Sequence, residues 1–108
     1  MNFLWNLIFK RKIRRDARVP LTQILEQVLS YLSKSEDSIW SDMEVEETVQ
    51  LINKQLHLLK SSGKVNLSKL NYLFLPTAPL QEIAMENGWV DEYLKLAEQF
   101  DSHMAKYC

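Results

Sequence analysis

Apolar residues recur at helical spacing along three stretches of the chain. The first stretch covers residues 21–34, where the apolar positions follow the i, i+3, i+4, i+7 pattern of one helix face. Pro20 precedes it, and proline suits the first turn of a helix but not its interior. We therefore predict a helix that begins after Pro20 and ends near Lys34. The apolar positions are Leu21, Ile24, Leu25, Val28, Leu29 and Leu32.

The second predicted helix has sequence signals at both of its ends. Ser41 and Glu44 have the spacing of a capping box, in which the two side chains accept the first backbone N–H groups of a helix. Gly63 follows two serines and is the predicted left-handed cap at the other end. The apolar face between these signals consists of Val45, Val49, Ile52, Leu56 and Leu59.

The remaining residues predict an irregular connector followed by two more helices. Two prolines oppose a helix across residues 64–79, and the apolar run at 72–75 suggests a short extended segment there. Residues 80–87 suit a short helix that ends at Gly88. A C-terminal helix follows, because apolar residues again recur at helical spacing. These residues are Trp89, Tyr93, Leu96, Ala97, Phe100 and Met104.

The fold class that these elements predict is all-α. We expect residues 1–108 to form a single compact bundle of four or five helices, with one short extended segment near 72–75. A chain of 108 residues suits one domain. With two glycines and three prolines in the whole chain, many tight hairpins are not expected.

Residues 1–18 form an apolar and then basic segment that either packs on the core or acts separately. This order is the reverse of that in a secretory signal, and the apolar run is shorter than the ~20 residues that span a bilayer. Three interpretations remain: a core helix, which we prefer, a helix lying in a membrane interface, and an arm on nucleic acid. In the membrane interpretation the contacting residues are Phe3, Leu4, Trp5, Ile8, Lys10, Arg11 and Lys12.

Charge is distributed unevenly along the chain. Residues 1–18 carry a net charge of +5 and residues 19–108 carry −6. The acidic body disfavours nucleic acid and favours a basic protein partner, because charge speeds encounter and an aromatic residue anchors the complex. The alternative is that Trp89 belongs to the core and the acids serve as caps and solubility charges. The partner-binding residues that we predict are Glu46, Glu47, Glu82, Glu86, Trp89, Asp91 and Glu92.

Candidate catalytic chemistry is sparse. The chain has two histidines and one cysteine, the terminal Cys108, so the four ligands of a structural zinc site are not available. Glu82 and Glu86 are spaced to converge on one helix face, with Asp91 as a third candidate, but acid–base catalysis also requires a cleft that shifts a pKa. We predict no catalytic residues, no metal, no cofactor and no enzymatic activity. The single cysteine is compatible with a reducing, cytoplasmic location.

One segment carries a recognisable motif. Residues 73–89, LFLPTAPLQEIAMENGW, place Leu-Gln-Glu-Ile after a proline-threonine turn, followed by Asn-Gly-Trp and an acidic helix. This segment resembles one in small bacterial proteins, some of which look like immunity proteins of toxin systems. The resemblance extends to about Asp101, a third of the chain. Ala78 and Val90 stand where the pattern has glycine.

The resemblance implies a small cytoplasmic protein that binds a cognate toxin and blocks its active site. Many such toxins are basic nucleases, which an acidic inhibitor would mask. Our functional prediction is therefore a non-enzymatic inhibitor of the immunity type. The alternatives are a peripheral membrane adaptor anchored through residues 2–18 and a structural subunit of a larger assembly.

Overall fold

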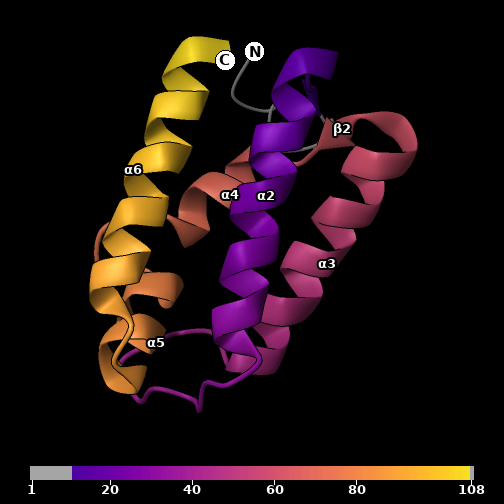
Figure 1. The fold of residues 1–108 in the computed structure, drawn as a ribbon. Helices are drawn as coiled ribbons and strands as arrows, with labels where there is room; N and C mark the ends of the chain where they lie inside the picture. The colour runs from indigo at the N-terminus through magenta and orange to yellow at the C-terminus, as the bar shows by residue number, and fades with distance from the viewer. Residues whose placement is uncertain (1–10, 108) are drawn as a thin grey trace.

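The computed structural model describes residues 11–107, with Arg11 and Tyr107 described by their backbone alone. The described part of the chain is mainly helical, which confirms the predicted fold class (Figure 1). In chain order the elements are β1 (Arg11–Lys12), α2 (Arg15–Leu32), α3 (Val45–Ser62), β2 (Lys64–Val65), α4 (Leu67–Leu73), α5 (Pro79–Asn87) and α6 (Val90–Tyr107).

Helix α2 is the centre of the bundle. It lies between α3 and α6 and packs against both, and α5 packs against α6 (Figure 1). Full burial of a leucine or isoleucine side chain contributes about 1.5–3 kcal/mol, so the apolar face of α2 supplies much of the driving force for folding. The buried residues of α2 are Ala17, Leu21, Ile24, Leu25, Val28 and Leu32.

Helix α2 begins five residues before Pro20, so the prediction that the helix starts after this proline was wrong. Ala17 and Ile13 are buried and extend the apolar stripe toward the N-terminus. Pro20 lies in the second turn, where its missing N–H leaves only the carbonyl of Asp16 without its usual helical donor. Burial of the first turn outweighs that single loss.

Helix α3 ends as predicted but begins one turn later than predicted. Gly63 is its left-handed cap, with φ of 73°. The capping box is formed by Glu44 and Glu47, whose Oε1 accepts the Glu44 N–H at 3.0 Å, and not by Ser41 and Glu44. The Ser41 hydroxyl instead accepts the N–H of Met43 at 3.2 Å.

Residues 64–73 are more regular than predicted. The extended pair is β2, which pairs antiparallel with β1 so that Lys12 lies opposite Lys64. Asn66 accepts the Lys69 N–H and starts α4, a short helix in place of the predicted irregular connector. The proposed extended segment at 72–75 is wrong, because Tyr72 is still helical and a turn follows. Burial of three leucines, one turn apart, explains why α4 forms: these are Leu67, Leu70 and Leu73.

The two C-terminal helices follow the sequence prediction. Pro79 is the first residue of α5, and Gly88 ends it with φ of 78°. Phe74, just after α4, stacks on Phe100 of α6 with ring centroids 4.1 Å apart. It also stacks on Tyr93 at 6.2 Å, so α4 is joined to α6 through aromatic contacts.

The two glycine caps differ in their surroundings, which allows a matched comparison. A Cβ at Gly63 would collide with the guanidinium of Arg18, whose Nε donates to the Ile13 carbonyl at 2.9 Å, whereas a Cβ at Gly88 meets open space. Gly88→Ala should therefore cost only the left-handed backbone penalty of about 1–2 kcal/mol. Gly63→Ala should cost about 1 kcal/mol more, because the Arg18 side chain must move away and give up its hydrogen bond to the Ile13 carbonyl. Thermal unfolding of both variants measures their losses in the free energy of unfolding. Equal losses for the two variants would contradict the expected difference.

Tyr93 should give an unusual mutational result. Its hydroxyl is buried without a hydrogen-bond partner among the described residues, and burial, followed by the charge of Asp101, raises its pKa to about 12. Because the folded-state pKa exceeds the ordinary value of 10.0, this group's contribution to stability is full below pH 10.0 and is lost as pH rises toward 12. Tyr93→Phe should unfold with equal free energy or with about 1 kcal/mol more at pH 7, and should weaken the alkaline loss. Denaturant unfolding at pH 7 and near pH 12 tests this. A marked loss in the free energy of unfolding of the variant at pH 7 would contradict it.

Candidate protein-binding site

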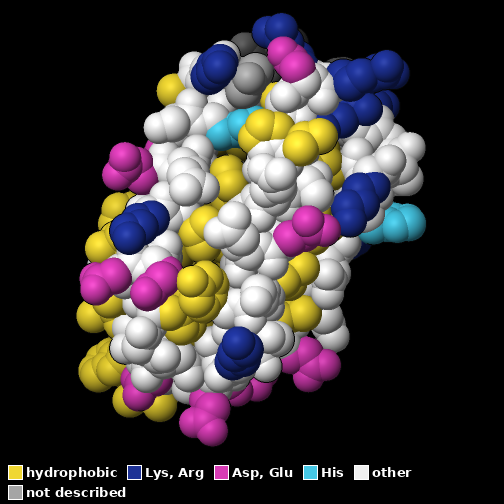
Figure 2. Space-filling model, viewed as in Figure 1, with side chains coloured by type: hydrophobic (Ala, Val, Ile, Leu, Met, Phe, Trp, Pro, Cys, Tyr) yellow, Lys and Arg dark blue, Asp and Glu magenta, His cyan; other side chains and the backbone are white. Residues whose placement is uncertain are grey.

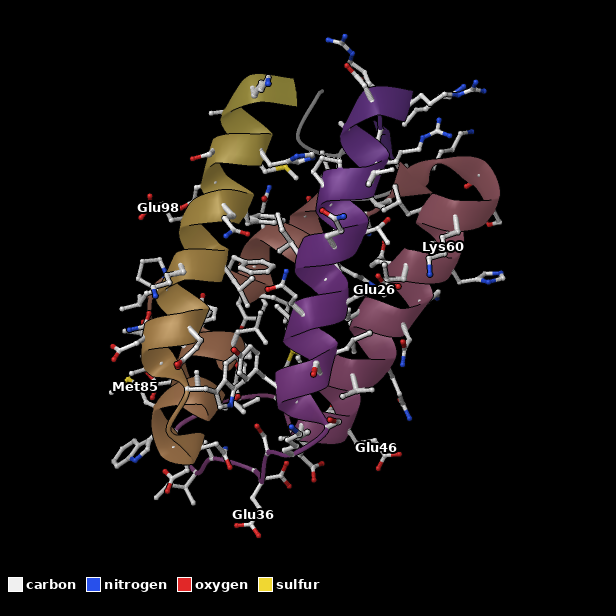
Figure 3. The ribbon with its side chains drawn as sticks, in the orientation of Figure 1. Glu26, Glu36, Glu46, Lys60, Met85 and Glu98 are labelled. Carbon is white, nitrogen blue, oxygen red and sulfur yellow. The ribbon has the colours of Figure 1, made fainter. Side chains whose placement is uncertain are left out.

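Two helices begin at the same end of the bundle and bring most of the predicted acidic residues together. Glu46 and Glu47 lie in the first turn of α3, and Asp91 and Glu92 lie in the first turn of α6. Figure 2 shows acidic side chains gathered at this lower end. In Figure 3, Glu36 and Glu46 point into solvent there. We call this surface the acidic end, and its exposed carboxylates are Glu36, Asp37, Asp42, Glu44, Glu46, Glu47, Glu86, Asp91 and Glu92.

Two of the predicted partner-binding residues do not fit this surface. Trp89 is only 5% exposed, so the prediction that it anchors a partner is corrected. Its ring stacks on Tyr31 at 4.9 Å, and its Nε1 donates to the Ser35 hydroxyl at 2.9 Å. Its place in the apolar spacing of the C-terminal residues explains this burial. Glu82 is half-buried in the first turn of α5, one turn before the exposed Glu86.

The long connection between α2 and α3 is tied to the corner between α5 and α6. The Asn87 side chain hydrogen-bonds the Glu36 backbone in both directions, accepting its N–H at 2.8 Å and donating to its carbonyl at 2.8 Å. Its Nδ2 also donates to the Ile83 carbonyl at 2.9 Å, which fixes the amide on α5. Together with the Trp89–Ser35 bond, these contacts hold the start of the connection in place.

The other half of the connection is held by side chains of its own. The Asp37 carboxylate accepts the Val45 N–H at 2.7 Å, at the first turn of α3. The Tyr72 hydroxyl donates to the Asp42 carboxylate, and this hydrogen bond is the main reason that the pKa of Tyr72 is raised. The connection is therefore attached to α3, α4 and α5 along its length.

Between these attachments, a tight turn exposes two large apolar side chains. The Ser41 N–H donates to the Ser38 carbonyl at 3.2 Å, and the Trp40 N–H donates to the hydroxyl of Ser38, which is buried. Ile39 and Trp40 occupy the centre of the turn and are 87% and 72% exposed. Sequence reasoning missed this pair. The available signal was an Ile-Trp dipeptide within a polar stretch that lacks helical periodicity.

The acidic residues around this turn create a strongly negative local field. Residues 33–47 include six acidic residues and one basic residue, Lys34. Several of these carboxylates also have a structural role, because Glu44 and Glu47 cap α3 and Asp37 accepts the N–H of its first residue. Capping explains why acids lie here. It does not explain why an isoleucine and a tryptophan are presented to solvent beside them.

Of the residues considered for catalysis, Glu86 and Asp91 are exposed to solvent and Glu82 is half-buried. Within residues 11–107, no group of three or more His, Cys, Asp or Glu side chains could hold a metal ion.

The predicted membrane-contacting residues are only partly within the described chain. Phe3, Leu4, Trp5, Ile8 and Lys10 lie outside the described residues. The backbone of Arg11 pairs with β2, and Lys12 is exposed. None of the described helices has both the length and the hydrophobicity needed to cross a bilayer.

No family model, curated protein or solved structure matches this chain. The resemblance of residues 73–89 to immunity proteins therefore stays a prediction.

Asn87→Ala should loosen the connection without unfolding the bundle. The substitution removes both hydrogen bonds to the Glu36 backbone, so we expect a loss of about 1–2 kcal/mol in the free energy of unfolding. Amide hydrogen exchange should accelerate at Glu36 and Trp40 more than in α2. Asn53→Ala, at an exposed site on α3, is the matched control. Unchanged exchange at Glu36 in the Asn87 variant would contradict this role.

Proposed function

We propose that this protein binds a basic protein partner through its acidic end and acts as a non-catalytic, immunity-type inhibitor of a toxin domain. The observation that carries this proposal is the exposed Ile39–Trp40 pair in an ordered turn surrounded by carboxylates. The resemblance of residues 73–89 supports the immunity type. The exposed carboxylates of the acidic end support a basic partner.

Ile39 and Trp40 have the properties of an interface anchor. Tryptophan is enriched among the few residues that carry most of the energy of a protein interface. The turn is held by backbone and serine hydrogen bonds, so little conformational entropy is lost when a partner covers it. Exposed apolar side chains also cost solvation energy in the unbound protein, and burial against a partner recovers that energy.

The surrounding carboxylates define the partner by charge. Opposite charge accelerates encounter and disfavours partners of like charge. The phosphate-binding surface of a nuclease is basic, and the acidic end is complementary to such a surface. In this proposal, Ile39 and Trp40 enter an apolar depression beside the basic groups, and the carboxylates cover those groups and exclude the nucleic acid.

Trp40→Ala should weaken the complex while leaving the fold intact, because the side chain is 72% exposed. We expect an affinity loss of about 30-fold or more, the range of an interface anchor. The tagged full-length protein is purified from its native cells, the co-purifying basic protein is identified, and its affinity is measured for both forms. Val19→Ala, at an apolar side chain 62% exposed on α2, is the matched control and should bind normally.

Two further readouts make this test decisive. The association rate of the complex should fall as salt rises, since steering by exposed charges is screened. Addition of the protein should abolish the toxic or nuclease activity of the partner. A partner that binds the Trp40 variant as well as the wild type, or that remains active in the complex, would overturn the proposal.

A further inference from the structure

The end of the molecule opposite the acidic end carries a basic surface. Pairing of β1 with β2 places Lys12 opposite Lys64, and α2 begins three residues after Lys12 with Arg15. Lys12, Arg14, Arg15 and Lys64 are all exposed, and we call these four residues the basic end. Figure 2 shows Lys and Arg side chains gathered at the upper right, where α2 begins and β2 lies in Figure 1.

The local acidic residue does not cancel this charge. Asp16 lies 3.5 Å from Arg14, and the two side chains are 59% and 68% exposed. A pair this open to water is weak and can be exchanged for another anion. The backbone of α2 also contributes partial positive charge where the helix begins. The basic end therefore keeps a net positive charge.

An exposed apolar side chain lies beside these cations. Val19 is 62% exposed and follows Arg15 by one turn on α2, so the two share a face of the helix. In the sequence, the apolar run of residues 3–9 immediately precedes the basic cluster. Cations combined with apolar side chains suit the boundary between lipid headgroups and acyl chains.

We propose that the basic end binds the anionic headgroups of a membrane surface, with Lys12, Arg14, Arg15 and Lys64 contacting lipid phosphates. This inference goes beyond the proposed inhibitor function and does not depend on it. A lipid surface is favoured over nucleic acid because Val19 finds an apolar environment in lipid and none along a phosphate backbone.

Membrane binding in this orientation keeps the two charged surfaces apart. The molecule extends 35 Å along its longest axis. Charges at physiological salt are screened over about 8 Å, so the acidic end is not appreciably repelled by the lipid. It also points away from the membrane and stays open to a protein partner. One molecule can therefore hold a partner at a membrane surface.

Flotation of the full-length protein with vesicles tests this proposal. The wild type should float with vesicles of phosphatidylglycerol and phosphatidylcholine, less so at high salt, and should stay unbound with phosphatidylcholine alone. The triple variant Lys12→Gln, Arg14→Gln, Arg15→Gln should lose about 100-fold in vesicle partition, about fivefold for each charge. Arg14 makes no side-chain cap hydrogen bond, and its ion pair with Asp16 is exposed and weak, so we expect α2 to begin at the same residue in the variant.

The matched control removes the same charge elsewhere. The triple variant Lys34→Gln, Lys54→Gln, Lys95→Gln changes three exposed lysines outside the basic end and should float like the wild type. Circular dichroism and melting temperature verify that both variants are folded. Equal loss of flotation in the two triple variants, or a wild type that stays unbound with anionic vesicles, would overturn the proposal. A wild type that binds a short DNA duplex but not the vesicles would assign this end to nucleic acid and overturn it as well.

Discussion

Asn87 and Trp89, at the corner between α5 and α6, hold the connection between α2 and α3 in place. The connection from Ser33 to Glu44 forms no helix, so its order depends on hydrogen bonds to side chains from elsewhere. Asn87 satisfies both backbone groups of Glu36, and Trp89 adds a bond to the Ser35 hydroxyl. These contacts join segments more than fifty residues apart in sequence. They fix where the connection runs and therefore what it presents to solvent.

The molecule has two ends of opposite charge. Helices α3 and α6 begin beside it with acidic first turns, whereas α2 begins at the other end within the basic cluster. Figure 3 shows that the ion pair of Glu26 and Lys60 lies between these ends, across α2 and α3. The acidic end also exposes Ile39 and Trp40, and Val19 is exposed beside the basic end. Charge selects the class of partner, and the apolar residues supply contact area. The proposed protein partner and the proposed membrane would therefore not compete.

The sequence was informative where structure depends on local pattern. Helical spacing predicts the buried face of α2, and Gly63 and Gly88 end their helices because both adopt positive φ. The start of α2 was predicted too late because the preference of proline for the first turn of a helix does not account for the burial gained by the residues before Pro20. Acidic neighbours suggested that Trp89 is exposed, although its helical spacing predicts the core. The turn that exposes Trp40 is closed by local hydrogen bonds to Ser38, but the path of the connection depends on Asn87, which is distant in sequence and which no local pattern links to Glu36.

A preformed interface at the acidic end requires that Ile39 and Trp40 are held in an ordered, exposed turn and are not part of a flexible loop. Nitrogen-15 relaxation of the free, full-length protein measures this directly. Backbone order parameters should be about 0.85 for both amides, as in the helices of the bundle. Values below about 0.6 at these two residues would mean that the turn is mobile and that the interface is not preformed.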